Sequence, residues 1–434
     1  MKEMELSYSR LKRGAANQES QSPFMTVSIL SAASLVCYMD RQLLAVLAEP
    51  IKLDLGLSDT TIGLVSGLAF ALFYAAFGVP MARLADRWSR KILLTGAVAF
   101  WTLSSMLCGM ASNLVQLLMA RIGVAAAEGG CVPTAHAIIG DQIVPRYRTL
   151  SISVFHAAGS VGLFVGSAAG GWLAKQYGWR TAFVYVSFPG LFVALLVWLM
   201  LDDTKPTTAG VAQTSDNKGL GALAALKILL RRSVLLNIGI GYAISSFGIQ
   251  AIGQWSSAFL IRSHGLDLTQ VGLWNGVANG IGSLAGLLIG GWLATILVIR
   301  DRRWELWLPA LANLIAAPLF VIALWMPNAV LTITCFLAAT LSWAIGMAPG
   351  LGAIQSITES GLKATAVACV VLFAAILGQG CGPFFTGVLS DILQPSNGSG
   401  SLRISLTIAC NAFVWSSLHF LYASKYFVRQ LISD

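Results

Sequence analysis

The sequence predicts an all-α membrane protein with twelve transmembrane helices in two six-helix bundles. Three observations support this prediction. Of the 434 residues, 56% are hydrophobic and only 11% are charged, whereas soluble domains carry about 25% charged residues. Apolar stretches near the ~20 residues needed to cross a bilayer recur along the chain. A short motif also occurs once in each half. The composition excludes soluble enzymes, disordered chains and disulfide-rich secreted domains.

The expected elements follow in chain order. Residues 1–23 form a polar cytoplasmic segment, and the first bundle, residues 24–201, contains six apolar stretches at about 24–48, 61–82, 92–112, 114–139, 150–174 and 180–201. Residues 202–232 form a polar linker, in which the basic part, Leu220 to Arg232, is expected as a helix on the membrane surface. The second bundle, residues 233–424, contains stretches at about 233–260, 270–298, 306–326, 329–353, 364–389 and 404–424, and residues 425–434 form a cytoplasmic tail.

Positive charge is unevenly distributed among the loops. The loops on the same side as the termini hold 21 of the 28 Lys and Arg residues, and the opposite loops hold five. Because cytoplasmic loops are rich in Lys and Arg, both termini are expected in the cytoplasm. This distribution explains the net charge of +9 without nucleic acid as a partner. The short termini carry no evident organelle address, so the bacterial inner (plasma) membrane is the expected location.

No cofactor or metal is expected. The seven cysteines all fall inside apolar stretches, and neither they nor the four histidines have metal-ligand spacing. The sequence contains no HExxH motif, nucleotide-binding loop or Ser/His/Asp set on facing spans that would indicate a membrane enzyme. We therefore do not expect an enzyme. The alternative that the chain is a receptor, which binds a ligand without transporting it, stays open.

An internal repeat supports the division into two halves. Leu55 to Gly67 aligns with His264 to Gly276, and six of the thirteen positions are identical. Ser58 and Asp267 occupy matching positions before the second and eighth helices, where a side-chain oxygen can cap the free N–H groups. Because six spans separate the two copies, both halves cross the membrane in the same orientation, as expected for a parallel repeat related by an axis along the membrane normal. Two bundles with a cavity between them suit alternating access.

Four ionisable residues fall deep inside predicted spans: Asp40 and Arg41 in the first, and Arg121 and Glu128 in the fourth. Each costs a few kcal/mol in the hydrocarbon region, so a function is expected. Arg121 and Glu128 are seven residues apart and therefore lie on one helix face, about 10.5 Å apart along the axis. Asp40 and Arg41 point about 100° apart, so their partners must come from another helix.

We expect these four side chains to face one aqueous chamber in the first bundle. There Asp40 and Glu128 would take up and release protons, while Arg41 and Arg121 would hold the carboxylates or the head group of a ligand. The alternative is a permanent ion pair that only holds the first and fourth helices together.

Other residues are candidates for the cavity wall because they are aromatic, amide or imidazole side chains inside spans. They are Tyr38, His156, Gln250, Trp255, Asn275, Asn279, Trp343 and Gln379. A cavity charged on one side and aromatic or amide-lined on the other would suit an amphipathic ligand with an anionic or zwitterionic head. The alternative for the tryptophans is packing or anchoring at the membrane interface.

The loop between the second and third helices carries Arg83, Asp86, Arg87 and Arg90. An aspartate among arginines can bridge helix ends in one conformation and release them in another, so we expect a cytoplasmic latch. The alternative is ordinary positive charge in a cytoplasmic loop.

These residues resemble the major facilitator superfamily over nearly the whole chain. Ala82 to Lys91 is similar to the conserved loop of that superfamily, although Ala82 and Ser89 replace its usual glycines. The chain is most similar to a bacterial member of the spinster lipid transporters. The residues that support this are Tyr38, Asp40, Arg41, Gln42, Arg121, Glu128, Gly178, Trp179, Arg180, Phe188, Pro189, Gly190, Gly380, Gly382, Pro383, Gly387, Ser390 and Asp391.

The resemblance implies a major-facilitator fold and a proton-coupled secondary transporter that works by alternating access, with Asp40, Arg41 and Glu128 in coupling. For spinster relatives it implies a lysophospholipid or sphingoid cargo. The alternative is a small organic anion or sugar acid. Ser167 stands where the antiporter signature has proline, which leaves symport and antiport open. The expected partners are the membrane, protons and the cargo, and the expected state is a monomer.

Overall fold

The computed structural model describes residues 23–85, 87–203, 233–358 and 363–433. These residues contain ten helical segments long and apolar enough to cross a membrane. Two of the ten, Pro145–Met200 and Cys369–Val428, are about twice the length of a single crossing. The first bends at Gly178, where the backbone leaves the helical region (φ 84°, ψ 159°). The second bends near Gly398 (φ 53°). The described residues therefore make twelve crossings, which confirms the predicted fold class.

The first half contains α2 to α10. Their bounds are α2 (Pro23–Val46), α3 (Ala48–Leu55), α4 (Asp59–Gly63), η1 (Leu64–Leu68), α5 (Ala69–Ala85), α6 (Arg90–Gly109), α7 (Leu114–Glu128), α8 (Cys131–Gln142), α9 (Pro145–Ser187) and α10 (Pro189–Met200). α4, η1 and α5 form one crossing, α7 and α8 form another, and α9 contains the whole fifth crossing and the start of the sixth.

The second half contains α13 to α21. Their bounds are α13 (Ser233–His264), α14 (Leu268–Gly276), η2 (Val277–Ile281), α15 (Gly282–Arg300), α16 (Trp304–Trp325), α17 (Ala329–Ile345), α18 (Met347–Ser356), α19 (Lys363–Ala374), η3 (Ala375–Cys381), α20 (Gly382–Asn397), η4 (Gly398–Gly400) and α21 (Ser401–Ser433). α21 continues past the expected end at residue 424, because Phe427 is fully buried in the core of this half.

Several expected segments lie outside the described residues. They are the N-terminal segment up to residue 22, most of the linker with its basic helix at Leu220 to Arg232, and Asp86.

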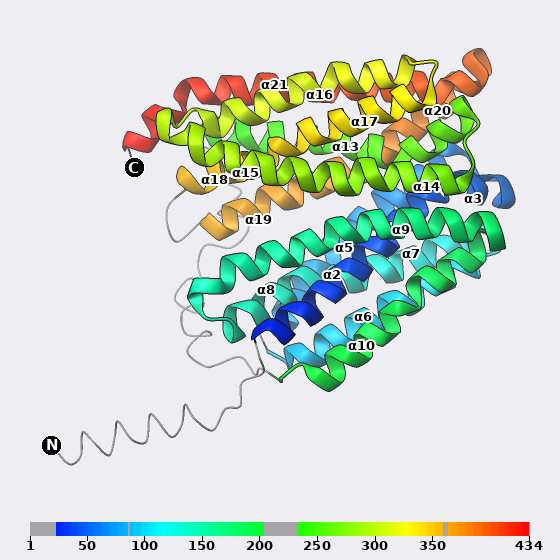
Figure 1. Ribbon diagram of the computed structural model, residues 1–434, viewed down its shortest axis with the longest axis horizontal. Helices are drawn as coiled ribbons and strands as arrows, with labels where there is room; N and C mark the ends of the chain where they lie inside the picture. Colours follow the sequence, from blue (N-terminus) through cyan, green and yellow to red (C-terminus); the bar gives the residue numbers. More distant parts are fainter. Residues whose placement is uncertain (1–22, 86, 204–232, 359–362, 434) are drawn as a thin grey trace.

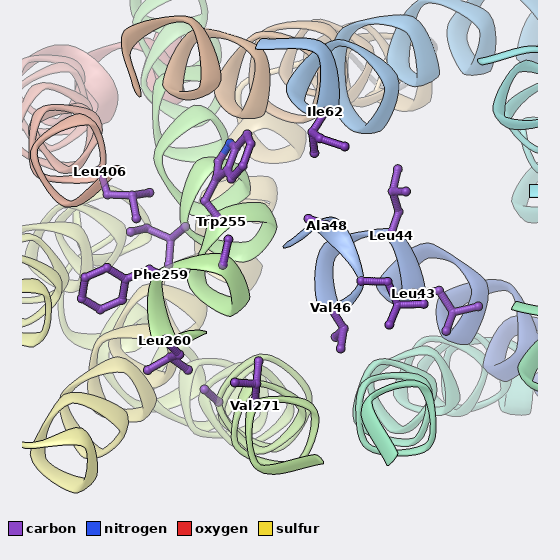
Figure 2. Packing of buried hydrophobic residues seen from close by; sticks show 14 of the residues in the cluster. Leu43, Leu44, Val46, Ala48, Ile62, Trp255, Phe259, Leu260, Val271 and Leu406 are labelled. Carbon is purple, nitrogen blue, oxygen red and sulfur yellow. The ribbon is translucent and has the colours of Figure 1, made fainter. Parts of the chain in front are cut away.

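The halves meet at one end of the molecule and separate at the other (Figure 1). At the end that holds α3, the start of α14 and the end of α20, one buried core contains residues of both halves, such as Leu43, Trp255 and Val271. Figure 2 shows Leu43 on the α2–α3 segment, Trp255 on α13 and Val271 on α14. Near the start of α2 and the end of α21 the core divides: one cluster contains only first-half residues and another only second-half residues. We call the first end the closed end and the second the terminal end.

The two copies of the repeat adopt the same local structure at the closed end. Gly56 and Gly265 both have left-handed backbone conformations, with φ of 62° and 63°, which glycine adopts without a Cβ penalty. Ser58 accepts a hydrogen bond from the N–H of Thr61, and Asp267 accepts from the N–H groups of the residues two and three positions later. The predicted caps of both helices are confirmed.

The glycines shared by the two copies pack the halves against each other. A Cβ atom at Gly272 would lie 2.4 Å from the carbonyl oxygen of Ser167, across the α14–α9 contact. In the other copy, a Cβ atom at Gly63 would lie 2.6 Å from the carbonyl oxygen of Pro383, across the α4–α20 contact. Small residues let helix backbones approach this closely. Gly63 and Gly272, which the two copies share, are therefore positions at which one half contacts the other.

Replacing Gly272 by alanine is expected to force the closed end apart, because the new methyl group meets backbone rather than a flexible side chain. Overpacking of this kind costs about 1–3 kcal/mol, enough to shift the population of a closed conformation. Spin labels at the exposed Leu53 and Ser396, one in each half, would measure the separation. Gly291→Ala is the matched control, since nothing lies within 4 Å of a Cβ there. Equal distances in both variants would contradict this role of the glycine contact.

Candidate functional site

A cavity of about 310 Å³ lies between the halves, beneath the closed end. Side chains of α2, η1, α7 and α9 form one wall. Side chains of α13, η2, α15, α17, α18 and the eleventh crossing form the other. The lining residues are Tyr38, Arg41, Gln42, Ala45, Ser66, Arg121, Leu163, Ile249, Gln250, Gly253, Gln254, Asn279, Ser283, Trp343, Met347, Gln379 and Pro383. The first half contributes both cations, and the second half contributes four amides, one hydroxyl group and an indole. The structure thus places seven of the sequence-derived candidates on one cavity: Tyr38, Arg41, Arg121, Gln250, Asn279, Trp343 and Gln379.

Arg41 and Glu128 form an ion pair between the first and fourth crossings. The Arg41 Nε atom lies 2.6 Å from Glu128 Oε2, and the carboxylate is fully buried behind the arginine. The rings of Tyr38, Phe70 and Tyr74 surround the guanidinium, with centroids 5.0 to 5.5 Å from its central carbon. Aromatic faces attract a cation at such distances. Arg41 is therefore held at the cavity wall with its acid partner behind it.

Arg121 lies on the same wall but has no carboxylate partner among the described residues. Its guanidinium stacks over Phe70, 4.9 Å from the ring centroid. The Nε and Nη1 atoms are buried and have no hydrogen-bond partner in the described protein. A buried group of this kind calls for an explanation, because an unpaired polar atom costs free energy. An arginine facing a cavity is suited to hold an anionic ligand.

Of the four charged residues, only Arg41 and Arg121 line the cavity, so the expectation that all four face one chamber is wrong. Glu128 lies behind Arg41, and Asp40 lies elsewhere. The Asp40 carboxylate is fully buried and accepts a hydrogen bond from the Ser187 hydroxyl at 2.7 Å. The same hydroxyl lies 2.9 Å from that of Ser105. The reason is the helical rotation of about 100° per residue. When Arg41 points to the cavity, Asp40 points into the first bundle, toward α6 and α9.

Three further candidates for the cavity wall also do not line it. Trp255 is fully buried, and its indole N–H donates to the Pro383 carbonyl oxygen at 2.9 Å. Asn275 is buried and bonded to two serine hydroxyls of α13. His156 packs against His136, with ring centroids 5.3 Å apart. Trp255 and Asn275 find hydrogen-bond partners between helices, the usual state of a buried polar group.

The residues of the expected latch are distributed differently from the prediction. Arg83 and Arg87 are exposed, whereas Arg90 is buried. Arg90 donates to the carbonyl oxygens of Ala85 and Ala137 and pairs with Asp141. This arginine therefore joins the third crossing to the fourth within one half. The latch itself stays a prediction, since Asp86 lies outside the described residues.

Asp59 lies at the centre of a charged network at the closed end that sequence reasoning missed. The guanidinium of Arg262, from the other half, donates to both of its oxygens at 2.7 Å. Lys52 and Ser390 also donate to this carboxylate, at 2.6 and 2.7 Å. Arg262 additionally pairs with Glu49 at 2.6 Å. A two-oxygen contact to arginine is among the stronger ion-pair geometries. In the sequence, Asp59 directly follows Ser58, the predicted helix cap. This position was the one signal that could have identified Asp59 as a candidate.

Two further polar contacts join the halves at this end. The carboxylate of Asp391 in α20 accepts from the backbone N–H groups of Asp59 and Thr60, at 3.1 and 2.7 Å. It thus caps a helix of the opposite half, where negative charge is favourable. Lys175 pairs with Asp267 at 2.9 Å. This lysine lowers the pKa of Asp267, so the aspartate is ionised at neutral pH. The closed end is thus held by charges as well as by glycine contacts.

A second cavity of about 180 Å³ extends into the second half. It shares Ile249, Gln250, Trp343 and Met347 with the first cavity, so the two adjoin at these residues. The rest of its wall consists of Tyr242, Ser245, Ser246, Pro309, Asn313, Gly346 and Phe420. Trp343 borders both cavities, and its indole donates to the Ser245 hydroxyl at 2.9 Å. Part of the wall is aromatic and aliphatic, which suits the apolar part of a ligand.

The described residues contain no group of three or more His, Cys, Asp or Glu side chains that could hold a metal ion.

Comparison with known proteins gives a consistent set of relatives. Residues 30–383 match the family model described as Major Facilitator Superfamily. The chain is 35% identical over 405 residues to an MFS-type efflux pump of Mycolicibacterium smegmatis, covering 92% of each chain. It is 25% identical to a probable L-galactonate transporter of Escherichia coli, covering 94% of this chain and 89% of the relative. It is 23% identical to the sphingosine-1-phosphate transporter SPNS2 of Danio rerio, covering 95% and 86%.

A solved structure shares the fold. The crystal structure of a bacterial homolog of the human lysosomal transporter spinster, in an inward-facing and unoccupied conformation, superposes with a TM-score of 0.83. It is 24% identical, and the match covers 94% of this chain and 99% of the other.

Proposed function

Since this chain belongs to the Major Facilitator Superfamily and resembles its spinster members, we propose that it moves an amphipathic anion by proton-coupled alternating access. The charge asymmetry of the loops supports a cytoplasmic terminal end, in the inner membrane of a bacterium. The closed end would then face outward, and the described conformation would be the inward-facing one. The protein carries its cargo across the membrane without chemical conversion.

The proposed coupling rests on the buried pair of Arg41 and Glu128. In the described conformation the carboxylate is paired, so its negative charge is balanced. When Glu128 takes up a proton, Arg41 loses its partner and is free to interact with an anion in the cavity. When the proton leaves, the ion pair re-forms and the anion is released. A one-unit pH difference is worth ~1.4 kcal/mol per proton, which is the energy available to bias this exchange.

The proposed cargo is a single-chain lipid with an anionic head, of the lysophospholipid or sphingoid type. The observation that carries this proposal is the unpaired Arg121 on one wall, combined with a side cavity behind Trp343 on the other. The head would lie against the arginines. The tail would enter the second half past Trp343 and pack on Phe420. The SPNS2 relative transports sphingosine-1-phosphate, which agrees with a head and tail of this kind.

A small organic anion or sugar acid is the second candidate. The amides of Gln250, Asn279 and Gln379 face the arginines across the cavity and could hydrogen-bond to sugar hydroxyl groups. The probable L-galactonate transporter of Escherichia coli and the hexuronate transporter of Bacillus subtilis are relatives at 25% identity.

Uptake by the purified protein in liposomes tests the proposal. Under an imposed pH gradient we expect accumulation of a labelled lysolipid, recovered chemically unchanged, and loss of accumulation when the gradient is collapsed. Gradient-driven uptake of a labelled sugar acid that excess lysolipid does not reduce, together with no uptake of lysolipid, would favour the second candidate. Equal uptake with and without the gradient would overturn the proton coupling.

A further inference from the structure

Arg121 is one of three cavity residues with buried donor atoms that have no partner among the described protein atoms. The others are Gln42 and Gln254, whose Nε2 atoms are buried and unpaired. All three residues line the same cavity. We infer that Gln42 and Gln254 complete, with Arg121, a site for a multiply charged oxyanion such as a phosphate monoester. This inference rests on the proposed function, because it names the head group that the cavity selects.

Gln42 projects from the first half. It lies on α2, four residues after Tyr38, so both side chains lie on one helix face, and both line the cavity. Gln42 is only 8% exposed, and its Nε2 atom is buried without a partner. Its neighbour Arg41 is engaged by Glu128. The amide is therefore a donor that the protein itself does not use.

Gln254 projects from the opposite half. It lies on α13, which packs on α2 and α3 near the closed end, and it shares the cavity wall with Gly253 and Gln250. Gly253 carries no side chain and has open space around it, which leaves room for a ligand beside Gln254. Gln42 and Gln254 therefore reach one cavity from helices that belong to different halves.

The chemistry of these groups restricts the ligand. An arginine has only donors, and a glutamine Nε2 has two N–H groups. Leaving such buried donors unpaired costs about 1–3 kcal/mol each. A phosphate monoester brings three terminal oxygens and no donor when fully ionised, so it can accept from several of these groups at once. A carboxylate brings two oxygens, and a neutral hydroxyl head adds donors of its own. The phosphate head therefore satisfies the site best.

Because Gln42 and Arg121 belong to the first half and Gln254 to the second, the bound head would also connect the halves. A ligand that binds one conformation better shifts the equilibrium by its difference in affinity. An oxyanion held by Gln42, Arg121 and Gln254 together requires both walls to be close. The anionic head would therefore favour closure of the cavity around it, whereas a neutral lipid would occupy the cavity without this effect.

The test compares three probes on the purified protein in nanodiscs. They are 1-oleoyl lysophosphatidate, monooleoylglycerol, which has the same chain without the phosphate, and glycerol 3-phosphate, which has the head alone. The measured quantity is the ratio of the dissociation constants of monooleoylglycerol and lysophosphatidate. Gln42→Leu and Gln254→Leu are each expected to lower this ratio about tenfold, the effect of one hydrogen bond to a charged group. Gln394→Leu, which changes an exposed glutamine of α20 that does not line the cavity, should leave the ratio within about twofold.

Each outcome separates this inference from the proposed function. Monooleoylglycerol binding reports whether each variant still folds and binds the chain. Wild-type protein that binds both lipids equally would overturn the oxyanion site while leaving a lipid cargo intact. Binding of glycerol 3-phosphate with the same dependence on Gln42 and Gln254, but no lipid binding, would support the site and overturn the lipid cargo. Equal effects of all three leucine variants on the ratio would also overturn the inference.

Discussion

Glu128→Gln is expected to abolish accumulation of cargo driven by a pH gradient while leaving exchange of cargo across the membrane intact. The glutamine can still accept a hydrogen bond from Arg41, so the helices stay together, but it has no proton to release. One proton per cargo and one pH unit would support about tenfold accumulation in the wild type. The variant should equilibrate its cargo and concentrate none. Uptake and counterflow in the same liposomes measure the two activities.

The matched control is Glu305→Gln. Glu305 is also buried, at 7% exposed, but it lies on α16 of the other half, where it accepts from the Ser356 hydroxyl. This control should keep accumulation at the wild-type level. Unchanged accumulation in Glu128→Gln would mean that the Arg41–Glu128 pair is a permanent structural contact, as the alternative from the sequence has it.

Asp59→Ala is expected to open the closed end. Arg262 would keep its ion pair with Glu49 but lose its hydrogen bonds to both carboxylate oxygens of Asp59. Lys52 and Ser390 would lose the acceptor of their hydrogen bonds. Removing one member of a buried ion pair costs about 3–5 kcal/mol. Because Arg262 and Asp59 belong to different halves, much of this cost is expected to fall on the closed conformation. The distance between spin labels at Leu53 and Ser396 should therefore increase.

Asp54→Ala provides the comparison. Asp54 pairs with Arg180 at 2.6 Å, but both side chains are more than 40% exposed, and exposed pairs contribute about 0–1 kcal/mol. Both variants remove an aspartate near the closed end, and only Asp59 is buried between the halves. A similar label distance in the two variants would contradict the role given to the Asp59 network.

Much of the fold was predictable because hydropathy and capping are local. A stretch of apolar residues must form a helix in a bilayer, where every backbone group has to be hydrogen-bonded within the chain. The caps at Ser58 and Asp267 depend only on the next few residues. The repeated glycines were visible as identities, although nothing local showed that they pack against the opposite half.

The site was predictable only in part, because helix rotation and helix neighbours are not local. That Arg41 needed an acid from another helix followed from the spacing of the charges. The rotation of each helix against its neighbours turns Asp40 toward Ser187. The same kind of rotation buries Trp255 and places Trp343 on the cavity wall. Gln42 and Gln254 were not candidates for the site, because a single amide in a span carries no signal by itself.

The amino-acid sequence alone determined the twelve crossings, the parallel repeat, the helix caps and the presence of charges in the membrane. Each of these depends on the transfer free energy or hydrogen bonding of neighbouring residues. Only the tertiary structure decided which groups meet. Arg41 and Glu128 are 87 positions apart and Arg262 and Asp59 are 203 apart, and such pairs form only where packing brings two helix faces together. Packing also decided that the halves join at one end and separate at the other, and so where the cavity lies.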